Sequence, residues 1–119
     1  MPLLSKGQIL AAQDMQFEDV DVPEWGGTVR VGSMSAAERD TYEQSLVSAM
    51  GPDRQLNMRN ARARLLAWCI VDEGGARVFE EADIEALGAK SAATVGRLFD
   101  VAARLNGIGR KDVEELTKN

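Results

Sequence analysis

The clearest alternation of apolar and polar positions in the chain lies between residues 19 and 31. Valines occupy every second position of two short runs: Val20, Val22, Val29 and Val31. This spacing places the valines on one face of an extended chain and the polar residues on the other. Pro23 cannot donate to a strand ladder and ends the first run, and the two glycines after Trp25 suit a tight reversal. We therefore predict a β-hairpin over residues 17–32, with Trp25 at its turn.

Other segments carry helix signals, and we predict helices over residues 6–13, 35–50, 57–71, 80–87, 91–106 and 111–117. Ser5 with Gln8, and Ser35 with Glu38, have the spacing of capping boxes, which mark helix starts. The clearest helical repeat lies in residues 91–106, where apolar residues recur three and four positions apart. Its members are Val95, Leu98, Phe99, Ala102 and Leu105.

The segment 57–71 is the most apolar of the predicted helices, so we expect it at the centre of the core. One of its faces carries Met58, Ala61, Leu65, Trp68 and Cys69. Its first half carries a basic cluster formed by Arg59, Arg62 and Arg64. A basic cluster in an acidic chain can be a partner site, although a solvated helix face is the commoner explanation. The pattern leaves both interpretations open.

These elements predict an α+β fold: a single domain over residues 1–119, mostly helical, with an N-terminal β-hairpin packed on a small helical core. The chain has 119 residues, of which 45% are hydrophobic and 28% charged. Both the length and this balance are ordinary for one globular domain and argue against wholesale disorder.

Charge and composition exclude several classes of partner. The net charge of −5 opposes binding to nucleic acid. No apolar run approaches membrane-spanning length, and residues 1–10 lack the basic start and apolar block of a signal peptide. The single cysteine excludes an internal disulfide framework, which fits a reducing compartment. We therefore expect a soluble intracellular protein that binds neither nucleic acid nor membrane.

Catalytic chemistry has little support in the sequence. The chain contains no histidine, which is the commonest general base and the commonest metal ligand. Cys69 has no histidine to pair with, and next to Trp68 it is expected to be a buried small hydrophobe. The glycine pairs lack the lysine or the spacing of phosphate-binding loops. We therefore expect no enzymatic activity, no metal and no cofactor.

Short motifs follow one another along nearly the whole chain: Pro23–Gly27, Val29–Val31, Ser35–Asp40, Val71–Gly75, Leu98–Ala102, Leu105–Asn106 and Asp112–Leu116. In this order they resemble the short tail assembly chaperones of long-tailed bacteriophages and prophages. The resemblance implies a small protein that coats the long, aggregation-prone tape measure protein in the host cytoplasm. It also implies recruitment of tail tube subunits and absence from the finished virion.

Members of that family also have a longer product made by ribosomal slippage near the end of the short reading frame. The chain ends Thr117-Lys118-Asn119, and A-rich codons there would supply a slippery run. A plain polar tail is the alternative. Reading the gene across the stop codon distinguishes the two, because slippage requires an overlapping frame downstream.

A chaperone of this kind needs apolar surface that it can offer repeatedly along an extended client. Apolar candidates for such contacts are Trp25, Val29, Val31, Met34, Met50 and Met58, and basic candidates are Arg59 and Arg62. For the valines and methionines an ordinary place in the core is the commoner explanation. Trp68 and Phe99 lie in the middle of apolar stripes, and we expect both in the core.

Coating a long client favours repeated neighbours, so the resemblance also implies a homo-oligomer. A structural or completion protein retained in the phage tail is the main alternative function. A small regulatory enzyme is disfavoured by the absence of histidine.

Overall fold

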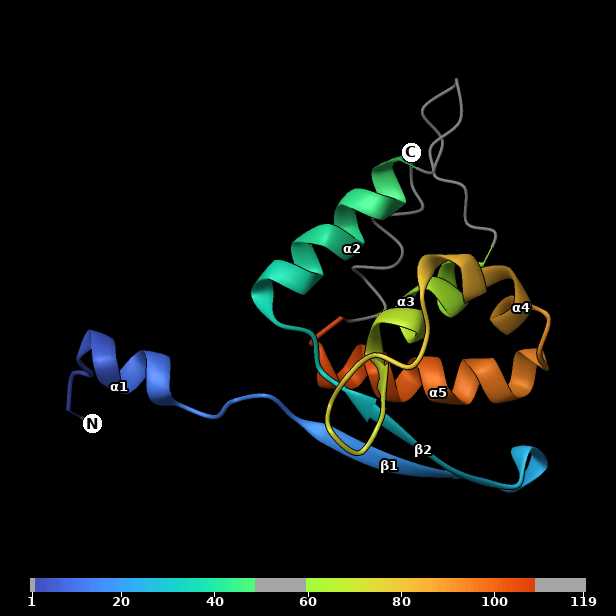
Figure 1. Ribbon diagram of the computed structural model, residues 1–119, viewed down its shortest axis with the longest axis horizontal. Coiled ribbons are helices and arrows are strands. Elements are labelled where there is room, and N and C mark those ends of the chain that lie inside the picture. Colours follow the sequence, from blue (N-terminus) through green and yellow to red (C-terminus); the bar gives the residue numbers. More distant parts are fainter. Residues whose placement is uncertain (1, 49–59, 109–119) are drawn as a thin grey trace.

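The computed structural model of the chain describes residues 2–48 and 60–108. Its elements, in chain order, are α1 (Lys6–Ala11), β1 (Phe17–Val22), the 3-10 turn η1 (Pro23–Trp25), β2 (Gly27–Gly32), α2 (Ala36–Ser48), α3 (Ala61–Cys69), β3 (Ile70–Val71), the 3-10 turn η2 (Glu81–Asp83), α4 (Ile84–Gly88) and α5 (Ala92–Leu105). The fold is α+β and mostly helical, as predicted (Figure 1).

The β-hairpin is confirmed, with β1 and β2 antiparallel and Val20 opposite Val29. A short third strand, β3, pairs with the other side of β2, so that the sheet order is β1-β2-β3. We had predicted that helix 57–71 continues to Val71, and this is wrong. Ile70 and Val71 are β-branched, and β-branched side chains pack well on a pleated sheet. They leave the helix after Cys69 and join β2.

Helix α5 covers one face of the hairpin, and α3 packs against α5, α4 and α2 (Figure 1). The central place predicted for this helix is confirmed, because most of its side chains are inaccessible: Ala63, Leu65, Leu66, Ala67 and Cys69. Leu65 and Leu66 together with Leu98 of α5 are among the largest fully buried side chains. Trp68, which we expected in the core, is only partly buried.

The predicted helix starts carry the expected caps. The Gln8 backbone N–H donates to Ser5 Oγ over 3.2 Å, and the Ser5 backbone N–H donates to Gln8 Oε1 over 2.8 Å. At α2 the Glu38 amide donates to Ser35 Oγ over 3.1 Å, and the Ser35 amide donates to Glu38 Oε1 over 2.9 Å. Each box satisfies two backbone donors that a helix start leaves unpaired.

The predicted helix 80–87 is a 3-10 turn, η2, followed by the single α-helical stretch α4. The periodic segment 91–106 forms α5, with Val95, Leu98 and Ala102 buried on its inner face. Phe99 of the same stripe is partly buried and packs against the core. The predicted helix 111–117 and residues 57–59 of the predicted central helix lie outside the described residues.

Helix α1 differs from every other helix because none of its residues is buried. It stands clear of the rest of the molecule at the end of an extended stretch that leads back to β1 (Figure 1). Within the described residues, no helix has the length and apolar character needed to span a bilayer.

Candidate interaction surfaces

The tip of the hairpin folds back onto the protein. Trp25 closes the turn η1, and the reversal continues through Gly26, whose φ of 82° lies in the left-handed region that glycine adopts at little cost. The Trp25 ring packs against the core and remains partly exposed. The Trp25 ring therefore covers part of the core, and the rest of the ring still faces solvent.

An ion pair fixes this tip to α5. The Glu24 carboxylate accepts hydrogen bonds from Arg97 Nη2 over 3.0 Å and from Arg97 Nη1 over 3.2 Å. The buried hydroxyl of Thr94 donates to the same carboxylate over 3.0 Å. The hydrogen bonds from Arg97 are the largest cause that lowers the pKa of Glu24 from 4.5 to about 2. The partly exposed Trp25 is thereby held in one place.

Two apolar candidates are not on the surface. Val31 is fully buried and Met34 is 9% exposed, because both belong to the core beneath α3 and α5. Of the two interpretations that the sequence left open for these side chains, a place in the core is therefore the one observed. Val29 is partly buried and packs against the core, so that part of it stays accessible.

The basic candidates have partners within the chain. Arg62 is exposed, with its guanidinium carbon 5.8 Å from the centroid of the Phe99 ring. Arg64, two residues on, forms an ion pair with Glu81 of η2. Arg59, Met50 and Met58 lie outside the described residues. For Arg62 and Arg64 these contacts favour a structural role over a free basic patch.

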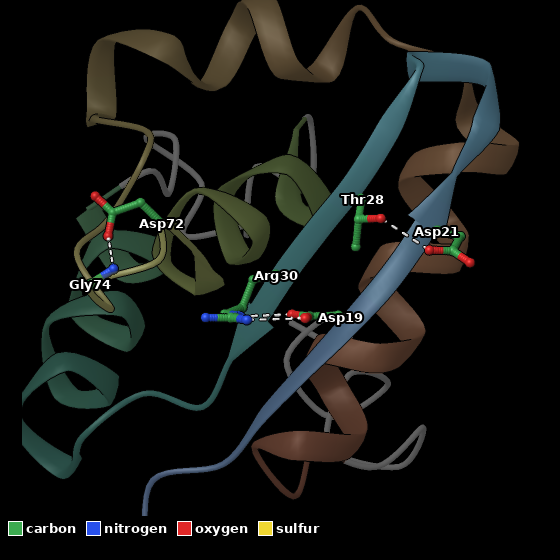
Figure 2. Close-up of polar contacts among 6 residues, drawn as sticks. All are labelled: Asp19, Asp21, Thr28, Arg30, Asp72 and Gly74. Carbon is green, nitrogen blue, oxygen red and sulfur yellow. Dashed lines mark hydrogen bonds and ion pairs between the residues drawn. The ribbon is translucent and has the colours of Figure 1, made fainter.

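The outward face of the hairpin is polar and internally satisfied. Arg30 of β2 donates to Asp19 of β1 over 2.7 Å and 3.1 Å, and Thr28 donates to Asp21 over 3.0 Å (Figure 2). The Arg30 hydrogen bonds lower the pKa of Asp19. In the described part of the chain no strand pairs with the outer side of β1. That edge carries acidic side chains, a common protection against unwanted strand pairing.

Most of the exposed large apolar side chains lie before the sheet, in the segment from Pro2 to Gln16, which we call the arm. These are Leu3, Leu4, Ile9, Leu10 and Met15, with exposed fractions of 99, 60, 56, 74 and 40%. We had predicted no partner-binding residue in this segment from the sequence. The apolar run at residues 9–12 was the available signal, but a sequence does not tell whether such a run has a partner within its own chain.

Beside the root of the arm lies a hollow of about 600 Å³. Its walls come from the arm root, the end of β2, the start of α2 and the end of α5: Asp14, Met15, Gln16, Ser33, Met34, Ser35, Ala36, Arg39, Asp40, Glu43, Leu105 and Asn106. Asn106 holds two of these walls together. Its Oδ1 accepts from the Met34 amide over 2.7 Å, and its carbonyl accepts from Arg39 over 2.6 Å.

The chain offers no clear chemical centre in its described part. Burial raises the pKa of the Cys69 thiol to about 12, so that the thiol stays protonated and unreactive at neutral pH. Asn106 Nδ2 donates to its sulfur over 3.4 Å. The described residues contain no group of three or more His, Cys, Asp or Glu side chains able to hold a metal ion.

A known protein family and a solved structure both match the chain. Residues 6–119 match a family described as phage tail assembly chaperone. The solved structure of the bacteriophage HK97 tail assembly chaperone matches with a TM-score of 0.56 and 22% sequence identity, over 83% of this chain and 90% of that one. At this identity the structural likeness supports the fold alone. No curated protein sequence matches the chain.

Proposed function

The chain belongs to the phage tail assembly chaperone family, and from that premise we propose that it binds the tape measure protein and keeps it soluble in the host cytoplasm. On the same proposal it helps to recruit tail tube subunits and leaves before the tail is complete. The family match over residues 6–119 is the observation that carries this proposal. The function is binding, and no step of it requires catalysis.

The distribution of apolar surface supports a binding role. The core of the described body is closed around α3, whereas aliphatic side chains of the arm are exposed. Phe17 at the start of β1 and Val78 are each 51% exposed. Exposed apolar groups gathered in one region of a soluble protein are typical of interaction sites.

We place the contact with the tape measure protein on the hairpin. Trp25 and Val29 are partly exposed there, whereas the acidic outer edge of β1 disfavours strand pairing. An exposed ring can contact many successive segments of a long client. Arg62, which is exposed on α3, remains a candidate outside the hairpin, and Arg59 remains a candidate from sequence alone.

Co-expression tests the proposal. The tape measure protein of the same phage should be more soluble when the chain is present than when it is absent. Trp25→Ala should reduce the soluble fraction, whereas Trp25→Phe, which keeps a ring at the turn, should retain most of it. Thermal unfolding of both variants separates lost binding from lost stability. An unchanged soluble fraction with Trp25→Ala at unchanged stability would remove Trp25 from the contact.

Purified virions distinguish the chaperone from a structural tail protein. On our proposal the chain is absent from finished particles, and its presence there in a fixed number of copies would favour a structural or completion role. We also propose a longer frameshift product as a partner. A downstream reading frame that overlaps the codons of Thr117–Asn119 would support it.

A further inference from the structure

The arm carries a helix whose apolar side chains pack against none of the other described elements of the chain. Helix α1 has a complete capping box but no buried residue, and Leu3 is 99% and Leu10 74% exposed. A helix of six residues is marginal in water unless its apolar face packs on something. In Figure 1 the helix projects away from the body, so none of the other described elements supplies that packing.

One face of α1 combines apolar and positive character. Lys6, Ile9 and Leu10 are three and four positions apart, so they share a face of the helix. Lys6 is the only charged residue between positions 2 and 13. The arm therefore presents two aliphatic side chains beside a single positive charge, although the chain as a whole is acidic.

The hollow beside the arm root has the complementary character. Met15, Met34 and Leu105 contribute apolar atoms to its walls. The ionisable residues in the walls are Asp14, Arg39, Asp40 and Glu43, three acids and one base, which gives a net charge of −2. Arg39 pairs with Glu43 over 3.1 Å, whereas Asp14 and Asp40 have no ion-pair partner among the described residues.

The same chain does not place its arm in this hollow. Two hydrogen bonds tie the arm root to the end of β2: the Gln16 amide donates to Ser33 Oγ over 2.9 Å, and the Ser33 amide donates to the Gln16 carbonyl over 2.8 Å. From this fixed point the arm runs outward (Figure 1). Helix α1 is therefore accessible to other molecules, and the hollow beside the root of the arm is left unfilled by α1.

We propose that α1 of one copy docks into the hollow of a second copy. Ile9 and Leu10 enter between the start of α2 and the end of α5, and Lys6 faces the unpaired Asp14 and Asp40. A hollow of about 600 Å³ is large enough for several aliphatic side chains. The biological use of this contact, which is to join copies along a client, rests on the proposed function. Its geometry does not.

Sedimentation of the purified full-length chain tests the contact without any client. The wild-type chain should associate as its concentration rises. Leu10→Asp should shift the midpoint of association at least about tenfold upward, because a carboxylate cannot enter an apolar and acidic hollow unpaired. Ala86→Asp is the matched control, since Ala86 is exposed and α4 lies across the body from the arm (Figure 1), and it should leave the midpoint unchanged.

Mixing two defective variants identifies the hollow as the acceptor. Ala36 is exposed and lines the hollow, so Ala36→Tyr should fill it while the body stays folded. At a concentration at which the wild-type chain associates, neither Leu10→Asp nor Ala36→Tyr should associate alone. Their mixture should form a complex, because one partner has an intact hollow and the other has an intact arm. A mixture that stays monomeric would overturn the proposal.

Other occupants of the hollow give different results. A wild-type chain that is monomeric at every concentration would show that the arm folds back or binds something else, and this overturns the proposal. Unchanged association of Leu10→Asp would do the same. A monomeric chain that still solubilises the tape measure protein would refute the arm contact and leave the proposed function intact.

Discussion

Single residues fasten the separate parts of this small protein together. Glu24 connects the hairpin tip to α5 through Arg97 and Thr94. Asn106, at the end of α5, contacts the backbone of Met34 and the thiol of Cys69. Such polar contacts bridge positions far apart in the sequence, so each of them has a consequence for stability that can be measured.

The Glu24 carboxylate makes stability depend on pH in a defined window. Its pKa falls from 4.5 to about 2 on folding, so its contribution is present above pH 4.5 and is lost as the pH falls towards 2. The difference in melting temperature between the wild-type chain and Glu24→Gln should therefore shrink from pH 5 to pH 2. Glu85→Gln, on the exposed side of α4, is the control. A gap that stays constant across this range would contradict the account.

Asn106 is expected to matter more than its partial exposure suggests. In Asn106→Ala the Met34 amide, which is part-buried, loses its acceptor. An unsatisfied donor of this kind lowers the free energy of unfolding by about 1–3 kcal/mol. Urea unfolding measures the change. Gln44→Ala, at an exposed position of α2, should cost far less, and equal losses in the two variants would refute this role for Asn106.

At the scale of elements, the sequence predicts best where burial follows a regular repeat. Helix α5 and the hairpin appear where their periods of about 3.6 and 2 predict them. Strand β3 was missed because Ile70 and Val71 continue the apolar run of α3, and a run of two residues carries no period of its own. For Val31 and Met34 the sequence left surface and core open, because an apolar pattern does not tell how completely another element covers it.

The arm shows the same limit for the site. A capping box predicts that α1 forms, and it does, but no local pattern states whether the helix packs on its own body. That depends on the total shape of the other elements. The exposed arm and the hollow therefore became visible only in three dimensions, whereas the hairpin tip with Trp25 was identifiable from its turn residues.

Two glycines in helices should respond in opposite ways to the same substitution. A Cβ added at Gly88, the last residue of α4, would lie 2.0 Å from Asn60 Oδ1, just before α3. That atom is the end of a flexible side chain that can turn aside, so Gly88→Ala should cost only about 1 kcal/mol, the low end for overpacking. A Cβ at Gly96, inside α5, meets nothing within 4 Å, so Gly96→Ala should stabilise by about 0.5–1 kcal/mol.

The double variant tests the cause of the first effect. Asn60 has a φ of 62°, which glycine tolerates better than asparagine. Asn60→Gly removes the side chain that a Cβ at position 88 would meet, so it should rescue Gly88→Ala in denaturant unfolding. If Asn60→Gly left the loss of stability caused by Gly88→Ala unchanged, the contact between Gly88 and Asn60 would not be the cause of that loss.

At the scale of the whole molecule, a closed body and an exposed arm coexist in one short chain. The body keeps its large apolar side chains around α3, and the arm leaves most of its own in solvent. On the proposed function the chain needs both a stable fold and surfaces for its partners. The separation of body and arm would allow it to bind other molecules without unfolding.

The most direct measurement is co-purification of the chain with the tape measure protein from cells that express both. We expect a soluble complex in which several copies of this chain accompany each tape measure protein. A tape measure protein that remains insoluble, or that elutes without this chain, would show that this chain is not its chaperone.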